Sequence, residues 1–145
     1  MGMVYAEIQL INAAEQEMAK RHVIGQDEVT SIRINMLVDS GAYMMAINET
    51  ISQQLNLTSK GKRKAQMADG SVVEYDVVGP IEVRFKNRDT VCNALVLPGD
   101  SEPLLGAIPM EEMDVLIHPL RQELIVNPEH PYFAQMSLKG IRRVK

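Results

Sequence analysis

The chain has 145 residues, of which 46% are hydrophobic and 23% are charged, and these values fit one soluble globular domain. The net charge of −4 argues against a chain built as a whole to bind nucleic acid. Cys92 is the only cysteine, which excludes an intrachain disulfide. No stretch is apolar over the length of a membrane-spanning helix, and the first residues lack the pattern of a signal peptide. A cytoplasmic protein is therefore expected.

Strands are predicted where apolar and polar residues alternate in the first part of the chain. Residues 4–11 alternate loosely, and residues 28–38 alternate well enough to indicate a half-buried strand. Residues 12–20 are rich in Ala, Glu and Met, which favours a helix, but the segment is short and both readings stay open. Gly25-Gln26-Asp27 marks a turn before the second strand.

A hairpin is predicted where Asp69-Gly70 lies between two extended segments, residues 63–67 and 72–77. Asp-Gly is typical of the type I′ turn, which needs a positive φ at both central residues. Two runs of basic residues are interpreted as a solvated loop and a solvated tail: Lys60, Lys62, Arg63 and Lys64, and then Arg142, Arg143 and Lys145.

The rest of the chain is predicted to be mostly β, with one or two short helices. Asn48 is expected to cap one helix, because its side chain can accept from an orphan backbone N–H and Ile51 and Leu55 then share one face. Gly79-Pro80 is expected to break the chain. The further predicted elements are strands at 81–85, 91–97, 114–118 and 123–126, a turn at 86–89 and a helix around 110–113. The pattern indicates an all-β domain over residues 1–128, followed by a tail, residues 129–145.

The strand at residues 28–38 runs directly into Asp39-Ser40-Gly41-Ala42. Gly41 has no side chain, so its backbone N–H can approach a carboxylate closely. The Ser40 hydroxyl can donate and accept hydrogen bonds and so lock the turn, and the small Ala42 leaves space beside the acid. Such a turn could hold Asp39 for chemistry, although Asp, Ser and Gly are also common in plain turns.

Two carboxylates that share one proton can hydrolyse a peptide bond, because like charges about 3 Å apart cannot both ionise. The anionic member takes a proton from water, and the protonated member polarises the carbonyl group. Asp-Ser/Thr-Gly occurs once in the chain, since Asp69-Gly70-Ser71 has a different order. If Asp39 has this role, the second carboxylate must come from a second chain related by two-fold symmetry.

Three motifs in order resemble those of the retropepsin-like aspartic proteases. Residues 36–42, Met-Leu-Val-Asp-Ser-Gly-Ala, resemble the apolar-apolar-Asp-Thr/Ser-Gly-Ala signature of that family. Ala68-Asp69-Gly70-Ser71 resembles its flap hairpin, and Leu104-Leu105-Gly106 resembles its apolar-apolar-Gly motif. The chain is most similar to the small single-domain bacterial members, over roughly residues 4–128, and is also similar to the protease domain of the DNA-damage-inducible relatives.

This resemblance implies a homodimer of closed β-barrel-like subunits, with a polypeptide substrate bound at an active site on the two-fold axis. It implies that Asp39 is the catalytic acid and base, that Gly41 contacts substrate, and that residues 68–71 form the tip of a flap that closes over the peptide. No cofactor, metal, nucleic acid or membrane partner is expected. Two features depart from the family pattern: Ser40 replaces the commoner Thr, and the flap has only Gly70 where viral enzymes have a Gly-rich tip.

The leading hypothesis is an aspartic endopeptidase that hydrolyses peptide bonds as a homodimer. The first alternative is a peptide-binding or dimerisation module on the same fold with weak or no catalysis, since fold does not fix function. The second is a structural partner in a larger complex, with a plain turn at Asp39.

The remaining candidate residues are interpreted as structural. Cys92 lies in a predicted strand and is interpreted as a buried, inert thiol. Met44 and Met45 are expected in the core or in the lining of a peptide pocket. Three histidines lack the spacing of metal ligands and are interpreted as surface or hydrogen-bonded residues: His22, His118 and His130.

Overall fold

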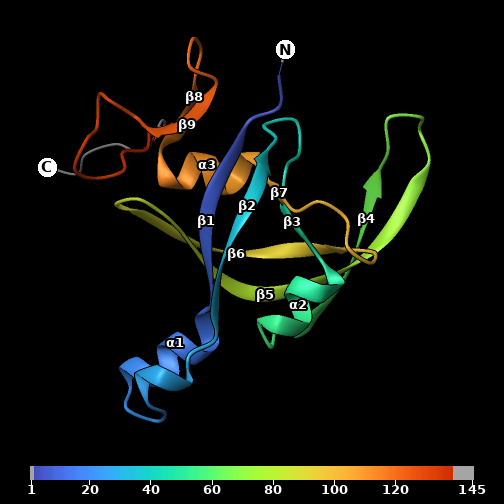
Figure 1. Cartoon of the computed structure of the whole chain (residues 1–145). Helices are drawn as coiled ribbons and strands as arrows, with labels where there is room; N and C mark the ends of the chain where they lie inside the picture. Colours follow the sequence, from blue (N-terminus) through green and yellow to red (C-terminus); the bar gives the residue numbers. More distant parts are fainter. Residues whose placement is uncertain (1, 139–145) are drawn as a thin grey trace, which may run out of the picture.

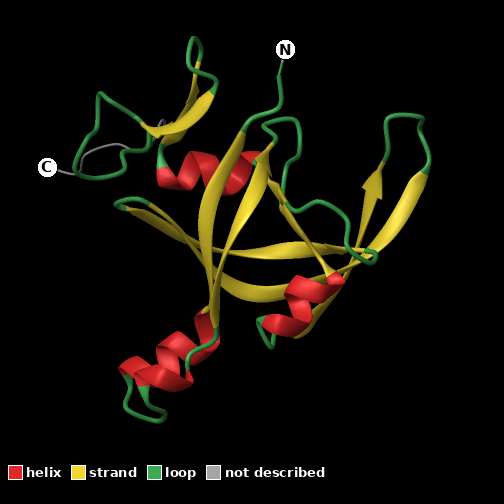
Figure 2. Cartoon of the chain, viewed as in Figure 1, coloured by secondary structure: helices red, strands yellow, loops and turns green. Residues whose placement is uncertain are grey.

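The computed structural model describes residues 2–138 and is mostly β-sheet with few helices, as predicted (Figure 2). The strands are β1 (Tyr5–Asn12), β2 (Ser31–Val38), β3 (Met45–Asn48), β4 (Thr58–Gln66), β5 (Val72–Phe85), β6 (Arg88–Leu97), β7 (Leu104–Leu105), β8 (Val115–His118) and β9 (Glu123–Val126). The helices are α1 (Ala13–Lys20), α2 (Glu49–Gln54), α3 (Ala107–Met113) and the 3-10 helix η1 (Gln26–Glu28).

Seven strands form one sheet in the order β1-β2-β7-β3-β6-β5-β4, and β8 and β9 form a separate two-stranded sheet (Figure 1). β1 also pairs with β5, through the partners Gln9 to Asn12 and Ile81 to Arg84. β4 lies at the end of the order, beside β5. The hairpin of β4 and β5 therefore extends away from the sheet (Figure 1). α1 projects from the sheet at the place where β1 ends and β2 begins (Figure 1).

The core consists mainly of aliphatic and methionine side chains, in a chain with 4% aromatic residues. Ile8 and Leu10 of β1 are fully buried, as is Ile47 of β3. Met36 and Met45 are also fully buried. Flexible methionine side chains can fill irregular core space, and this chain has no tryptophan to do so. This core lies under the ends of β2 and β7 and so supports the segments that follow them.

Asparagine side chains explain why two helices begin where they do. The Asn48 side chain accepts from the Ile51 N–H at 2.8 Å, and Ile51 and Leu55 are buried, which confirms the predicted cap and apolar face. The Asn12 side chain accepts from the Glu15 N–H at 3.0 Å, so the open segment 12–20 is helical and the structure has one more α-helix than predicted. Among residues 2–138, no helix is both long enough and apolar enough to cross a bilayer.

The predicted chain break at Gly79-Pro80 is wrong, because β5 continues through it. The pairing of β5 with β6 shifts register between Val78 and Ile81, which is a β-bulge. Gly79 has a φ of 153°, and a Cβ added there would lie 3.2 Å from the Cα of Asn93. Glycine at this position therefore lets the strand bend without ending.

Several predicted boundaries also differ. β2 begins at Ser31 rather than at residue 28, because residues 26–28 form η1. The turn before β6 is only Lys86-Asn87, with a positive φ of 52° at Lys86, so β6 starts at Arg88. The basic residues from Lys60 to Lys64 lie in β4, so their interpretation as a loop is wrong. The second basic run lies outside the described residues.

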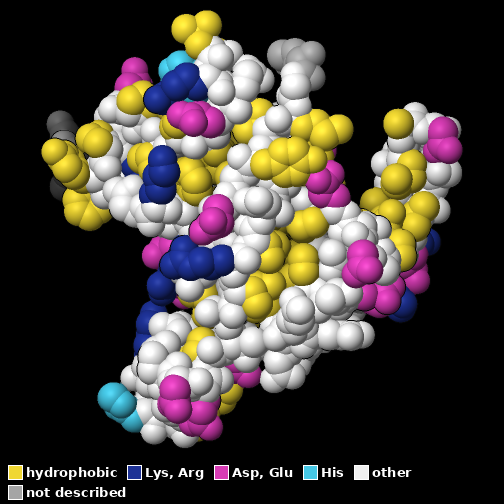
Figure 3. All heavy atoms as spheres, in the orientation of Figure 1, with side chains coloured by type: hydrophobic (Ala, Val, Ile, Leu, Met, Phe, Trp, Pro, Cys, Tyr) yellow, Lys and Arg dark blue, Asp and Glu magenta, His cyan; other side chains and the backbone are white. Residues whose placement is uncertain are grey.

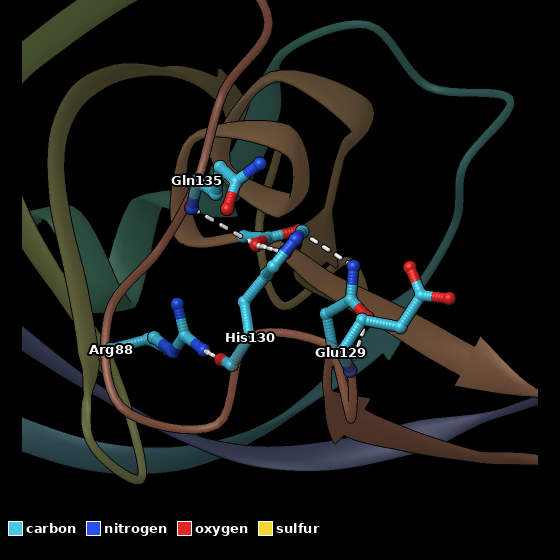
Figure 4. A network of polar contacts seen from close by, with 6 residues as sticks. Arg88, Glu129, His130 and Gln135 are labelled. Carbon is cyan, nitrogen blue, oxygen red and sulfur yellow. Dashed lines mark hydrogen bonds and ion pairs between the residues drawn. The ribbon is translucent and has the colours of Figure 1, made fainter.

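Residues 127–138 have no regular structure, but polar contacts fix them to the domain (Figure 4). The Asp114 carboxylate accepts from the Asn127 side chain at 3.1 Å and from the Gln135 N–H at 3.0 Å, and it lies 2.6 Å from His130 Nδ1. The buried Arg88 guanidinium donates to the His130 carbonyl oxygen. The described part of the tail is therefore anchored beside α3 and β6.

Candidate active site

The backbone holds the Asp39 turn at the end of β2. The Asp39 N–H donates to the Leu105 carbonyl at 3.0 Å, which continues the pairing of β2 with β7. The Asp39 carboxylate accepts from the Gly41 N–H at 2.9 Å, and the Asp39 carbonyl accepts from the Ala42 N–H at 3.1 Å. The Asp39 side chain is half-buried. This geometry leaves one carboxylate oxygen tied to the turn and the group as a whole within reach of solvent.

Gly41 has its expected place, but Ser40 does not lock the turn. A Cβ added at Gly41 would lie 3.2 Å from the Asp39 carboxylate oxygen, which is tighter than an ordinary contact. Ser40 is exposed, and no hydrogen bond of its hydroxyl is found within residues 2–138. The turn is instead held by the backbone N–H groups of Gly41 and Ala42, which donate to Asp39.

The Leu104-Leu105-Gly106 motif lies against the Asp39 turn. Leu104 and Leu105 pair in parallel with Leu37 and Val38 of β2. Just after the motif, the Ala107 N–H donates to the Ala42 carbonyl at 2.7 Å. Segments more than sixty residues apart in the sequence thus form one structural unit around the carboxylate.

Replacing Gly106 with Ala is expected to destabilise this unit. A Cβ at that position would lie 2.8 Å from the Ala42 carbonyl oxygen and still closer to the carbonyl of Met44. Because both neighbours are backbone atoms, the turn after Asp39 would have to shift, and overpacking of this kind costs about 2 kcal/mol. Urea unfolding should show this loss for Gly106→Ala. The exposed Gly2, which has nothing within 4 Å of an added Cβ, provides the control Gly2→Ala.

The predicted hairpin is present, but its turn is not type I′. The Gly70 N–H donates to the Met67 carbonyl at 3.0 Å, and the Ser71 carbonyl accepts from the Met67 N–H at 2.7 Å. Gly70 has a φ of 87°, whereas Asp69 has a negative φ. The loop is therefore longer than a two-residue turn, and Gly70 supplies the one left-handed residue that closes it.

The Asp69 carboxylate stabilises the tip of this hairpin. It accepts from the Ser71 hydroxyl at 2.6 Å and from the Ser71 N–H at 2.9 Å. Hydrogen bonds from the Ser71 side chain and then its backbone lower the pKa of Asp69. The charge of Asp69 is thus used to order the turn itself. Residue 68, the remaining member of the predicted tip, is exposed.

Two cavities adjoin the Asp39 turn. One of about 530 Å³ includes Asp39 and lies between the N-terminal residues Met3 and Val4 and the turn that joins β8 and β9. The other, of about 470 Å³, lies between residues 41–44 and the inner face of the β4–β5 hairpin. The tip, residues 68–71, lines neither cavity. Contact between the tip and Asp39 is thus not part of this structure.

The second cavity contains residues that the motifs do not indicate. Met44 lines it, in agreement with one of the two expected roles, whereas Met45 is fully buried in the core. Arg63 and Tyr75 also line it, from facing positions in β4 and β5. Because side chains alternate along a strand, the sequence of residues 63–67 is enough to predict that Arg63 and Met67 lie on the same face of that strand. The sequence does not show which face of the strand lies toward the Asp39 turn.

Two of the histidines have hydrogen-bond partners, as expected for structural residues. His118 Nδ1 accepts from the Leu120 N–H at 3.2 Å and from the Arg121 N–H at 3.1 Å, and so closes the turn between β8 and β9. His130 binds Asp114. No cluster of three or more His, Cys, Asp or Glu side chains suited to a metal is found within residues 2–138.

The Cys92 thiol is expected to react slowly in the native protein. Burial, with a smaller contribution from the Glu112 carboxylate, raises its pKa to about 12. Since the thiolate is the reactive species, modification at neutral pH should be at least about a hundredfold slower than for an unfolded cysteine of ordinary pKa. The rate of reaction of Cys92 with a chromogenic disulfide, measured in buffer and in a denaturing concentration of urea, tests this difference. Equal rates would contradict the burial of the thiol.

Comparison with known proteins places the chain in a family. The family model described as aspartyl protease matches residues 24–108, which is more than half of the chain. The chain therefore belongs to the aspartyl protease family, and its resemblance to the retropepsin-like enzymes is confirmed. The match contains the Asp39 turn, the hairpin tip and the Leu104-Leu105-Gly106 motif. No curated protein matches the chain.

Proposed function

We propose that the protein is an aspartic endopeptidase whose active site contains two Asp39 carboxyl groups, one from each protomer of a homodimer. The main observation that supports this proposal is the geometry of the Asp39 turn. The half-buried carboxylate accepts from the Gly41 N–H at 2.9 Å, and the Asp39 N–H donates to the Leu105 carbonyl. The chain has one Asp-Ser-Gly, so the second carboxyl group of the proposed pair comes from a second copy.

The surroundings of Asp39 support an interface at this place. Met3, which lines the Asp39 cavity, is 72% exposed, and Leu120 in the adjoining β8–β9 turn is 88% exposed. Tyr43, just after the catalytic turn, is 71% exposed. Burial of such side chains against a second copy would favour association by about 25 cal/mol for each square ångström of apolar surface. We also infer that each protomer is a closed barrel, on the basis of the β1–β5 pairing.

In the proposed reaction, water attacks the scissile carbonyl carbon. The anionic Asp39 carboxylate takes a proton from that water, while the protonated Asp39 of the other protomer gives its proton to the carbonyl oxygen. The tetrahedral intermediate then breaks its C–N bond: the leaving nitrogen takes the proton that the first Asp39 removed from water, and one hydroxyl of the intermediate gives its proton to the other Asp39 carboxylate, which restores the starting pair. The Gly41 N–H keeps the carboxylate in one orientation throughout, and the β4–β5 hairpin is proposed to cover the peptide.

An unbiased peptide library tests this function. Wild-type protein should cleave peptide bonds within the library at some pH between acidic and neutral, and Asp39→Asn protein should not. Peptide binding without any cleavage that depends on Asp39 would instead support the binding module on the same fold. Cleavage that survives in Asp39→Asn protein would contradict the proposal.

A further inference from the structure

The β4–β5 hairpin has two faces of different character. In the ladder Lys62 lies opposite Asp76 and Lys64 opposite Glu74, and the Lys62 ammonium lies 3.0 Å from the Asp76 carboxylate. These residues form the outer face, where each lysine lies directly across the ladder from an acidic residue. Side chains alternate along a strand, so Arg63 points to the other face.

Arg63 is the cation on the inner face, opposite Tyr75. Its guanidinium donates to the Met44 thioether at 3.1 Å. A thioether is a weak acceptor for a group with five N–H donors and a full charge. Within residues 2–138, no carboxylate lies within 4.0 Å of the Arg63 guanidinium, whereas Lys62 one residue away has such a partner. Arg63 thus has unused capacity to bind an anion.

The cavity of about 470 Å³ beside Arg63 is lined by no acidic side chain. Arg63 also borders a smaller cavity, of about 210 Å³, that Glu112 lines, but the Glu112 carboxylate is bonded to the Thr90 hydroxyl. Leu95, Leu97 and Leu104 contribute apolar lining to the larger of these cavities. Gly41, whose N–H donates to the Asp39 carboxylate, also lines it, so the cavity adjoins the Asp39 turn. Lys64 also borders the cavity and lies opposite Glu74 in the ladder, and its ammonium is paired with no carboxylate within 4.0 Å among the described residues. In the space-filling view the hairpin stands away from the body as an arm, with a notch between the two (Figure 3). A peptide in this notch would meet apolar surface and the Arg63 guanidinium, with the Lys64 ammonium at the border of the same cavity.

We propose that Arg63 is a specificity-determining residue that selects polypeptides with an Asp or Glu beside an apolar residue. The apolar side chain fills the cavity between the hairpin and residues 41–44, and the carboxylate binds the guanidinium. The preference is a local property, because the chain as a whole carries a net charge of −4 and would repel an acidic peptide at long range. The inference rests on the proposed protease function for its consequence, but the binding it describes does not need catalysis.

The test compares two peptides that differ only in one Glu or Gln beside the apolar residue of a cleaved sequence. Both have blocked ends, so that a terminal carboxylate cannot replace the side chain. Wild-type protein should prefer the Glu peptide by about fivefold in kcat/KM, the upper size of an ion pair at an exposed side chain. Arg63→Gln should remove that preference, and Arg63→Glu should reverse it in favour of a Lys peptide.

Lys62→Gln is the matched control, because it removes the same charge from the adjacent residue of the same strand. It should keep the preference for Glu. A wild-type ratio near one, or equal loss of preference in both variants, would overturn the role of Arg63. Binding of the same two peptides to Asp39→Asn protein, followed by fluorescence anisotropy, separates the two proposals. Binding that depends on Arg63 without cleavage by wild type would refute the protease function and support the Arg63 site, while absence of both would refute both.

Discussion

Asp39→Asn protein is expected to cleave peptides at least about a thousandfold more slowly than wild type. The Asn side chain has nearly the shape of Asp and can still accept from the Gly41 N–H, which Asp39 binds at 2.9 Å. The fold and the turn should therefore remain, while the group that takes a proton from water is lost. The measurement is kcat/KM for the best peptide of the library, with thermal unfolding to show that the variant folds.

A mixing experiment tests whether the site is shared between two chains. If wild-type and variant chains pair at random, an equal mixture places about half of the wild-type chains in pairs with one Asn side chain. Such pairs lack one carboxyl group of the proposed pair, so the activity per wild-type chain should fall by about half. A larger excess of variant should lower it further. Activity that stays constant for each wild-type chain would show that one chain is sufficient.

Features that depend on neighbouring residues could be predicted from the sequence. The Asn48 cap needs only an acceptor three residues before Ile51, and the hairpin at Asp69-Gly70 needs only a residue that tolerates positive φ. The Asp39 turn is of the same kind, since its carboxylate binds the N–H two residues later. These local interactions have the same geometry in most chains, so a pattern of residue types is enough to indicate them.

Features that depend on distant partners could not be predicted in this way. Gly79 reads as a break, but its close approach to Asn93 makes it part of a bulge within one strand. Arg63 reads as part of a solvated basic loop, but the pairing with Tyr75 turns it toward the cavity. Both outcomes depend on which strand lies alongside, and no single segment carries that information.

Replacing Asp114 with Ala is expected to lower the free energy of unfolding by about 3 kcal/mol at neutral pH. The change leaves the Asn127 amide, the Gln135 N–H and the His130 ring without the acceptor they share. Water replaces that acceptor poorly, because the Asp114 side chain is only 14% exposed. Asp114 also has a φ of 56°, a conformation that Ala adopts at a cost of about 1 kcal/mol. Urea unfolding measures the loss, and Asp89→Ala, which removes an exposed carboxylate, should cost far less.

The pH dependence of this effect follows from the Asp114 pKa. Burial raises that pKa, but the hydrogen bonds from Asn127, Gln135 and His130 outweigh burial, and the pKa lies below its ordinary value of 3.8. A lowered pKa in the folded state means that the contribution to stability is complete above about pH 4 and is lost as the pH falls through the folded value. Residues 127–138 should therefore stay anchored in the mildly acidic range in which paired carboxyl groups act.

Asp114→Asn separates the charge from the backbone, because Asn tolerates the left-handed conformation. The difference in unfolding free energy between wild type and Asp114→Asn should be present at pH 5 and should shrink as the pH falls below about 4, because the unfolded carboxyl group then takes up a proton before the folded one does. Hydrogen exchange at the Gln135 N–H should rise in the variant at neutral pH. A difference that grew as the pH fell below about 4 would mean that Asp114 is stabilised in its neutral form, and the anchoring of residues 127–138 would then need another cause.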